Sequence, residues 1–146
     1  MPGGGVLGKL FKPVMNMQIA RYRRSNSPTQ PVMMGFPTVL LTTVGSKSGL
    51  ERTSVLGGFP DGEGAWLIVA SKGGAPDHPS WYKNLVAHPE VEVQVGTKKM
   101  KARARTAGGA ERGKLWEQAI KFWPPYTDYQ KKTEREIPVV VLDPVN

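Results

Sequence analysis

The chain has 146 residues, of which 39% are hydrophobic and 22% charged, values that suit one domain with a packed core and argue against disorder. Lysine and arginine number 20 against 12 acidic residues, and the formal net charge of +8 favours an anionic partner: nucleic acid, a membrane surface or a phosphorylated small molecule. Cysteine is absent, which excludes disulfides, iron–sulfur clusters and thiolate zinc sites and suits a reducing cytoplasm.

The first predicted element is an amphipathic helix within residues 1–24. Its apolar side chains recur at spacings of three and four, lysines and arginines flank them, and Pro13 interrupts their regularity. The favoured interpretation is a helix docked over the mouth of the domain, and the alternative is a helix lying at a membrane surface. No apolar run is long enough to span a bilayer, so we expect a cytoplasmic protein, with the membrane alternative placing it at the inner face of the cell membrane.

Residues 25–146 predict a single domain that is mainly β with inserted helices. Strands are expected at residues 38–44, 53–59, 66–70, 91–95, 99–105 and 137–142. The pair Gly57-Gly58 interrupts the second strand, which indicates a bulge or a close backbone approach. Helices are expected at residues 79–87, 110–122 and 126–132. Because strands and helices do not alternate strictly, a mostly antiparallel barrel is favoured over a parallel Rossmann sheet.

The turn between the first two strands is a candidate anion site. Its sequence is Gly45-Ser46-Lys47-Ser48-Gly49-Leu50-Glu51-Arg52. Two glycines permit a tight turn with exposed N–H groups, and Lys47, Ser48 and Arg52 add charge and a hydroxyl, which suits a phosphate or carboxylate. A solvated hairpin turn explains the same residues equally well. The glycine and lysine spacing is not that of a Walker phosphate loop.

A second candidate loop follows the buried strand at residues 66–70. Here Ala70-Ser71-Lys72-Gly73-Gly74 again combines a hydroxyl, a cation and a flexible backbone. Taken alone, an ordinary surface loop is slightly favoured. Two such loops in one small basic domain favour a shared anionic ligand.

Metal chemistry is not expected. His78 and His88 are the two histidines, each beside a proline, and neither belongs to a recognised metal-binding motif.

The aromatic residues give a different signal, because Tyr126 and Tyr129 share one face of a helical turn. With Trp81 they could border a planar ligand, although core packing is the more ordinary role of such residues.

Five segments occurring in one order carry a resemblance to a known family. They are residues 40–52, 70–74, Pro79-Ser80-Trp81-Tyr82-Lys83-Asn84-Leu85, Pro124-Pro125-Tyr126-Thr127-Asp128-Tyr129-Gln130 and Arg135-Glu136-Ile137-Pro138-Val139-Val140. Together they resemble the deazaflavin-dependent nitroreductase family of actinobacteria, whose members use coenzyme F-420, an 8-hydroxy-5-deazaflavin. The resemblance runs from the N-terminal helix to the last strand. It implies a split β-barrel of the flavin-reductase type.

The resemblance also implies a role for each matching segment. Lys47, Ser48, Gly49 and Arg52 would hold the phosphate and acidic tail of the coenzyme. Ala70, Ser71, Lys72, Gly73 and Gly74 would line the deazaflavin end, and Trp81 would cover the groove. Tyr126 and Tyr129 would border the substrate side of the ring. The proton for the product would come from Tyr126, Tyr129, Ser71 or water, and these alternatives stay open.

The implied function is hydride transfer from reduced F-420 to a small apolar acceptor such as a quinone, an enone or lactone, or a nitro compound. Gly57 stands where nitroimidazole-activating members tend to have a bulky aromatic, which disfavours that substrate class. The alternatives are an FMN- or haem-type split-barrel protein and a non-enzymatic F-420 carrier. No nucleic-acid-binding module is recognised, so specific nucleic-acid binding is not expected.

Overall fold

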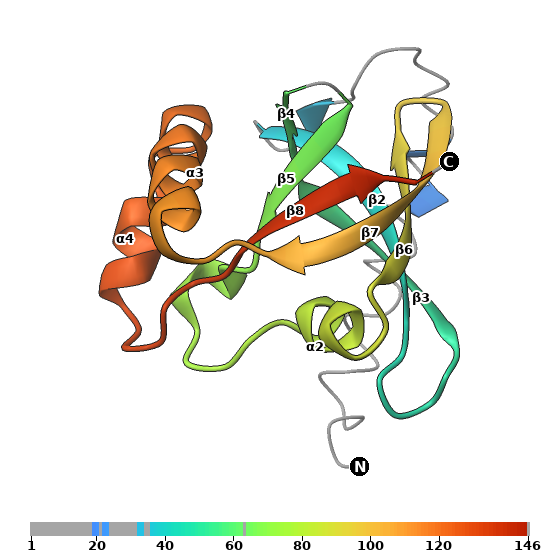
Figure 1. The fold of residues 1–146 in the computed structure, drawn as a ribbon, viewed down its shortest axis with the longest axis horizontal. Helices are drawn as coiled ribbons and strands as arrows, with labels where there is room; N and C mark the ends of the chain where they lie inside the picture. The colour runs from blue at the N-terminus through green and yellow to red at the C-terminus, as the bar shows by residue number, and fades with distance from the viewer. Residues whose placement is uncertain (1–18, 21, 24–31, 34–35, 63, 146) are drawn as a thin grey trace.

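The computed structural model describes residues 19–20, 22–23, 32–33, 36–62 and 64–145. Over these residues an antiparallel eight-stranded sheet forms, with three α-helices and one short 3-10 turn around it (Figure 1). The strands are β1 (Val32–Met33), β2 (Phe36–Val44), β3 (Glu51–Gly57), β4 (Phe59–Asp61), β5 (Ala65–Val69), β6 (Glu90–Val95), β7 (Lys98–Thr106) and β8 (Val139–Pro144). The helical elements are η2 (Lys72–Gly74), α2 (Ser80–Ala87), α3 (Gly109–Phe122) and α4 (Tyr126–Lys131).

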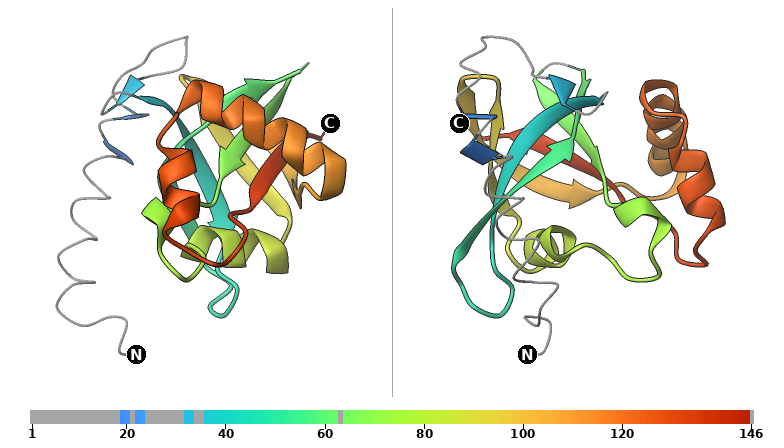
Figure 2. Two further views of the ribbon diagram at one scale, coloured as in Figure 1. Left: turned by 90° about the vertical axis from the view of Figure 1, so that its left-hand side faces the viewer. Right: turned by 180° about the vertical axis from the view of Figure 1, so that it is seen from behind.

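The sheet curls into a barrel that stays open along one seam. Hydrogen-bonded neighbours run in the order β1-β2-β6-β7-β8-β5-β4, and β3 pairs only with β2 among the described strands. Strands β3 and β4 are consecutive in the chain but do not pair, so the barrel is not closed between them. The helices α3 and α4 stand to one side of the barrel, whereas α2 lies below it (Figures 1 and 2).

Two apolar clusters hold these parts together, one on each face of β5 and β8. Val140 and Leu142 point into the barrel, where Leu85 of α2 also packs. Val139 and Val141 point the other way, beneath α3 and α4. Each fully buried side chain of this size contributes about 1.5–3 kcal/mol. The uninterrupted apolar run of β8 is therefore explained by burial on both faces, whereas β6 and β7 alternate because their outer faces meet water.

The chain passes from β3 to β4 at Gly58, so the single strand expected at residues 53–59 is in fact two. A Cβ built on Gly58 would lie 2.7 Å from Cγ1 of Val39, which leaves no room for a side chain. The predicted close backbone approach is therefore present, and it redirects the chain across the seam. The last strand also begins later than expected, at Val139, because Pro138 cannot donate a ladder hydrogen bond.

Most of the predicted N-terminal helix lies outside the described residues. Residues 19–20 and 22–23 are helical, and Tyr22 is 1% exposed. Its hydroxyl lies 3.2 Å and 3.0 Å from the carbonyl oxygens of Thr38 and Gln94, and it accepts the N–H of Gly96 at 3.0 Å. This end of the segment is thus docked on β2 and the β6–β7 hairpin. None of the helices in the described part of the chain is long and apolar enough to cross a membrane.

Candidate active site

A basic hollow lies beside the hairpin that joins β2 to β3. Its volume is about 440 Å³, and it is lined by Gly45, Ser46, Lys47, Ser48, Arg52, Thr53, Ser54, Ser80, Trp81 and Asn84. The lining residues supply two cations and several hydroxyl groups, and none of them is a carboxylate. Such a surface suits an anion with several oxygen acceptors.

The hairpin loop is closed by its own backbone. The N–H of Gly45 donates to the carbonyl of Leu50 at 2.8 Å, and the N–H of Gly49 donates to the carbonyl of Gly45 at 2.9 Å. Gly49 has a φ of +71°, a conformation that favours glycine. A Cβ on Gly45 would lie 2.4 Å from Oγ of Ser48. A side chain at Gly45 would thus displace Ser48, whereas the backbone shape of the loop requires Gly49, which does not itself line the hollow.

Asn84 fastens this loop to the helix below it. The side chain is only 7% exposed; its Oδ1 accepts the N–H of Ser46 at 3.0 Å, and its Nδ2 donates to Oγ1 of Thr43 at 3.1 Å. Sequence reasoning missed Asn84 as a site residue, although it lies one helical turn after Trp81 on α2. That spacing was the available signal, because residues three apart on a helix share a face.

A second hollow, the tyrosine hollow, lies at the open seam of the barrel. Its volume is about 310 Å³, and its lining residues are Val55, Leu56, Gly57, Val69, Ser71, Lys72, Gly73, Pro79, Trp81, Tyr126 and Tyr129. Trp81 lines both hollows, so they adjoin one another at its side chain. A ligand with an anionic tail and a planar head could therefore occupy both.

The loop after β5 forms part of the tyrosine hollow. Ser71 is in the right-handed helical region, and Lys72 follows at a φ of +46°. This sequence of conformations turns successive N–H groups toward one side and creates a concavity that binds anions. The ammonium group of Lys72 is 2.9 Å from a carboxylate oxygen of Asp77, in an exposed ion pair that contributes little to stability.

Two residues assigned to this loop lie behind the hollow. Ala70 is fully buried, and its N–H donates to the carbonyl of Pro138 at 2.9 Å. Gly74 is packed against α4, where a Cβ would lie 2.6 Å from the carbonyl oxygen of Tyr129. Both residues therefore set the position of the loop rather than line the hollow.

The two tyrosines come from one face of α4, as their spacing predicted. Tyr126 is 4% exposed, its ring meets that of Tyr129 edge-on at 6.1 Å between centroids, and burial raises the pKa of its phenol. Among the described residues, none forms a hydrogen bond with either hydroxyl. Tyr126 thus stays protonated at neutral pH, and its hydroxyl can donate to a molecule in the hollow.

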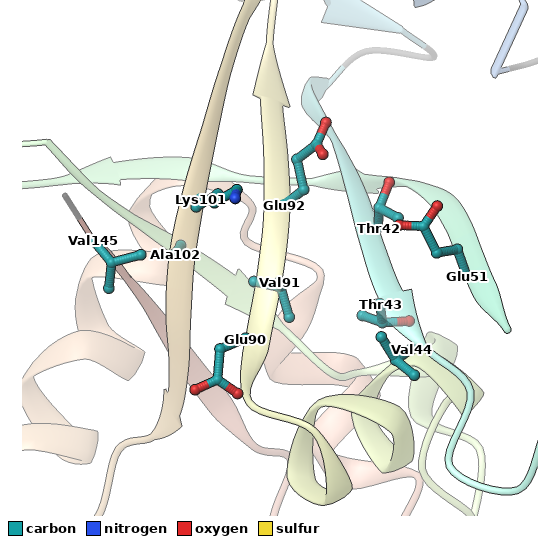
Figure 3. A pocket seen from close by; sticks show the side chains of 10 residues that line it. All are labelled: Thr42, Thr43, Val44, Glu51, Glu90, Val91, Glu92, Lys101, Ala102 and Val145. Atoms are coloured by element: carbon teal, nitrogen blue, oxygen red, sulfur yellow. The ribbon is translucent and has the colours of Figure 1, made fainter. Parts of the chain in front are cut away.

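A third hollow has the wrong charge for an anionic ligand. It is lined in part by Glu51, Glu90 and Glu92, with Lys101 as its one cation (Figure 3). The carboxylates come from β3 and β6. Of the three hollows, the basic and tyrosine hollows are therefore the ones that suit the expected ligand.

Comparisons with known proteins support the same ligand class. A family model described as F420H(2)-dependent quinone reductase matches residues 14–144. An F420H(2)-dependent quinone reductase of Mycobacterium tuberculosis strain H37Rv is 40% identical over 133 residues, which cover 88% of this chain and 89% of the relative. A solved F420-H2 dependent reductase is 46% identical with a TM-score of 0.68, and the match covers 73% of this chain and 94% of that chain.

More distant structures share the fold alone. The haem storage protein HutZ of Vibrio cholerae has a TM-score of 0.53 at 17% identity, and the match covers 90% of this chain and 91% of that chain. The predicted split-barrel fold, deazaflavin coenzyme and oxidoreductase class are confirmed by the family model and the relatives that match over most of their length. The chain belongs to the F420H(2)-dependent quinone reductase family.

Proposed function

We propose that this protein reduces quinones, with the anionic tail of coenzyme F-420 in the basic hollow and the deazaflavin ring in the tyrosine hollow. The observation that carries this assignment is the meeting of the two hollows at Trp81. A basic, hydroxyl-lined surface and a hollow bordered by tyrosines are thereby placed end to end.

The residues fit such a ligand in charge and in hydrogen-bonding groups. Coenzyme F-420 carries a phosphodiester and several carboxylates, and the basic hollow offers Lys47, Arg52 and hydroxyl groups without an opposing carboxylate among its lining residues. At the other end, the N–H groups of the loop after β5 suit the polar edge of a flavin-like ring. When bound, the reduced deazaflavin supplies a hydride.

The residues of the tyrosine hollow then position the acceptor and stabilise its charge. A quinone gains negative charge on oxygen as it is reduced, and a phenol that donates to that oxygen lowers the barrier. Tyr126 and Tyr129 can both donate, because the described residues leave their hydroxyls without an acceptor. The hydroxyl of Ser71, which also lines the hollow, is a third donor. Gly57 adds no side chain to the seam, which leaves room for a flat acceptor.

We also propose that residues 25–146 form the coenzyme-binding domain and that residues 1–24 are an amphipathic helix docked over the mouth of the barrel, with peripheral contact to a membrane as the alternative. Quinones with long apolar tails dissolve in bilayers, so a basic amphipathic helix would bring the domain to its substrate. The docked side chain of Tyr22 supports a fixed attachment of this helix to the barrel.

The test is oxidation of reduced F-420 with menadione as the acceptor, beside a binding titration with F-420 and with FMN. We expect turnover with reduced F-420, saturable binding of F-420 and weaker binding of FMN, which has no extended acidic tail. Preferential binding of FMN would contradict the assignment of the basic hollow. Tight F-420 binding without turnover of any quinone would instead indicate a carrier.

A further inference from the structure

The loop after β5 holds an unusual backbone conformation. Three successive residues have left-handed φ values, Lys72 at +46°, Gly73 at +62° and Gly74 at +86°. Lys72 is the one non-glycine residue with positive φ in the described part of the chain. An L-residue in this region is strained, and such strain persists only where the surroundings enforce it.

Arg135 makes the contacts that can enforce this conformation. Its guanidinium donates to three carbonyl oxygens of the loop: Nη1 to Ala70 at 3.2 Å, Nη2 to Ser71 at 2.9 Å and Nε to Ala75 at 2.9 Å. Nη1 also lies 3.1 Å from Nδ1 of His78. One side chain thus holds both ends of the loop, although it lies about sixty residues away in the sequence.

The backbone around Arg135 is itself held in place from α4. The carbonyl of Arg135 accepts from Nε2 of Gln130 at 2.8 Å, and the N–H of Ile137 donates to Oε1 of the same glutamine at 2.9 Å. Gln130 follows Tyr129 directly on α4. The helix that carries the tyrosines and the loop that carries Ser71 are therefore connected through Arg135.

Peptide geometry decides where the N–H groups of this loop point. In a trans peptide the carbonyl of one residue and the N–H of the next point in opposite directions. The carbonyls of Ala70 and Ser71 point to Arg135, so the N–H groups of Ser71 and Lys72 point away from it. Ser71 and Lys72 line the tyrosine hollow, whereas Arg135 does not. Neither N–H group forms a hydrogen bond with another described residue.

We propose that Arg135 is a positioning residue that holds Lys72, Gly73 and Gly74 in their left-handed conformation, so that the N–H groups of Ser71 and Lys72 bind the ring end of the coenzyme. The inference rests on the proposed placement of the ring in the tyrosine hollow. Arg135 acts through the loop and does not touch the ligand.

The test compares Arg135→Ala, Arg135→Lys and Arg135→Gln with Arg103→Ala, which removes an arginine from an exposed pair with Glu90 on the barrel surface. The readouts are the F-420 dissociation constant from coenzyme fluorescence and hydrogen exchange of the Gly74 and Ala75 amides without coenzyme. The N–H of Gly74 donates to the carbonyl oxygen of Ser71 at 2.9 Å, and that of Ala75 donates to the carbonyl oxygen of Lys72 at 3.1 Å. Exchange of these amides therefore reports the loop conformation. Thermal unfolding identifies the variants that fold. If Arg135→Ala does not fold, the Arg135→Lys and Arg135→Gln variants provide the comparison.

We expect roughly tenfold weaker binding or more in all three Arg135 variants, because a pre-organised site is lost. We also expect faster hydrogen exchange of the Gly74 and Ala75 amides in these variants. The Arg103→Ala protein should have the affinity and the exchange rates of the wild type. Millimolar guanidinium should restore binding to Arg135→Ala, whereas ethylammonium should not, because a planar donor is needed to reach several carbonyls.

Three results would overturn the inference. These are wild-type affinity in Arg135→Ala, full affinity in Arg135→Lys, and unchanged exchange of the two amides in variants that fold. If the wild-type protein did not bind F-420, the proposed function would fail, and the exchange experiment would still decide whether Arg135 holds the loop.

Discussion

Lys47 and Arg52 are the two cations for which we propose a role in binding the anionic tail of the coenzyme. Both side chains lie at the surface and line the basic hollow. An exposed cation contributes little to the stability of the fold. Its effect on an anionic ligand is larger, because charge-assisted hydrogen bonds are stronger than neutral ones.

Replacing Lys47 or Arg52 by alanine should therefore weaken F-420 binding by about 1–2 kcal/mol each, without changing the melting temperature. Lys114→Ala, which removes an exposed cation from α3, is the matched control and should bind F-420 as the wild type does. Added salt should weaken F-420 binding by the wild type more than binding by a variant that carries both substitutions. Equal affinity in all these proteins would remove the hairpin from the coenzyme site.

The tyrosine pair offers a separate test at the residue scale. Tyr126→Phe and Tyr129→Phe each remove a hydroxyl that no described residue binds, so we expect unchanged thermal stability. Because an oriented donor to the reduced acceptor is lost, kcat should fall by about 10²-fold in at least one variant while the F-420 dissociation constant stays the same. Full turnover in the double variant would identify water or Ser71 as the proton source.

At the scale of elements, the passage from β3 to β4 shapes the seam. Gly58 donates its N–H to the carbonyl of Pro37 at 3.1 Å and packs directly on Val39. Among the described strands β3 pairs with β2 alone, and its last residues, Val55, Leu56 and Gly57, border the tyrosine hollow. The close packing of Gly58 on Val39 thus lies where the chain crosses the open seam.

Gly58→Ala should destabilise the protein by about 1–3 kcal/mol, because its Cβ overlaps Val39. Gly113→Ala is the matched control: Gly113 lies in α3, and a Cβ there would meet nothing within 4 Å. That change should stabilise the protein by about 0.5–1 kcal/mol. Chemical denaturation measures the change in unfolding free energy for both variants. A stable Gly58→Ala protein would mean that Val39 can move aside at little cost.

The N-terminal segment is the other element with a separable role. Deleting residues 1–18 keeps Tyr22 and its contacts with β2 and the β6–β7 hairpin. We expect F-420 binding and menadione reduction to persist, but reduction of long-tailed quinones in liposomes to fall. The full-length protein should sediment with anionic liposomes and be released by salt. Loss of F-420 binding in the deletion variant would assign the segment to the coenzyme site.

For the whole molecule, pH acts on the contact between His78 and Arg135, the arginine that also binds the loop after β5. Burial lowers the pKa of His78 below its ordinary 6.5, and the charges of Arg135 and Lys83 lower it further against the opposing effect of Asp77. The ring is therefore neutral in the fold, and its Nδ1 accepts from Arg135. His78 binds a proton more readily in the unfolded chain than in the fold. Its neutral form therefore contributes to the free energy of unfolding fully above pH 6.5, and this contribution is lost as pH falls through the lowered pKa of the folded protein.

The wild-type protein should accordingly lose more unfolding free energy between neutral pH and mildly acidic pH than His78→Asn, whose amide oxygen can accept without titrating. Denaturant unfolding at a series of pH values measures the difference. The lowered pKa of Asp77 affects a separate window, below its ordinary 3.8. Parallel curves for the two proteins above that window would show that His78 carries no linkage to folding.

The local features of this protein follow from the amino-acid sequence alone. Alternating residues marked β6 and β7, the glycines of residues 45–49 marked the hairpin, and the spacing of Tyr126 and Tyr129 placed both on one face. These patterns are readable because they depend on neighbours in the chain, through strand and helix periods. The ordered motifs then identified the coenzyme class that the comparisons confirmed.

How these features combine into a site depends on contacts that form in the folded chain. The division of one apparent strand at Gly58 depends on Val39, and the shape of the loop after β5 depends on Arg135. Asn84 reaches the hairpin across nearly forty residues, and Trp81 joins two hollows lined by separate segments. Such contacts leave no periodic signal in the sequence, because they arise only after the sheet has curled and brought distant segments together.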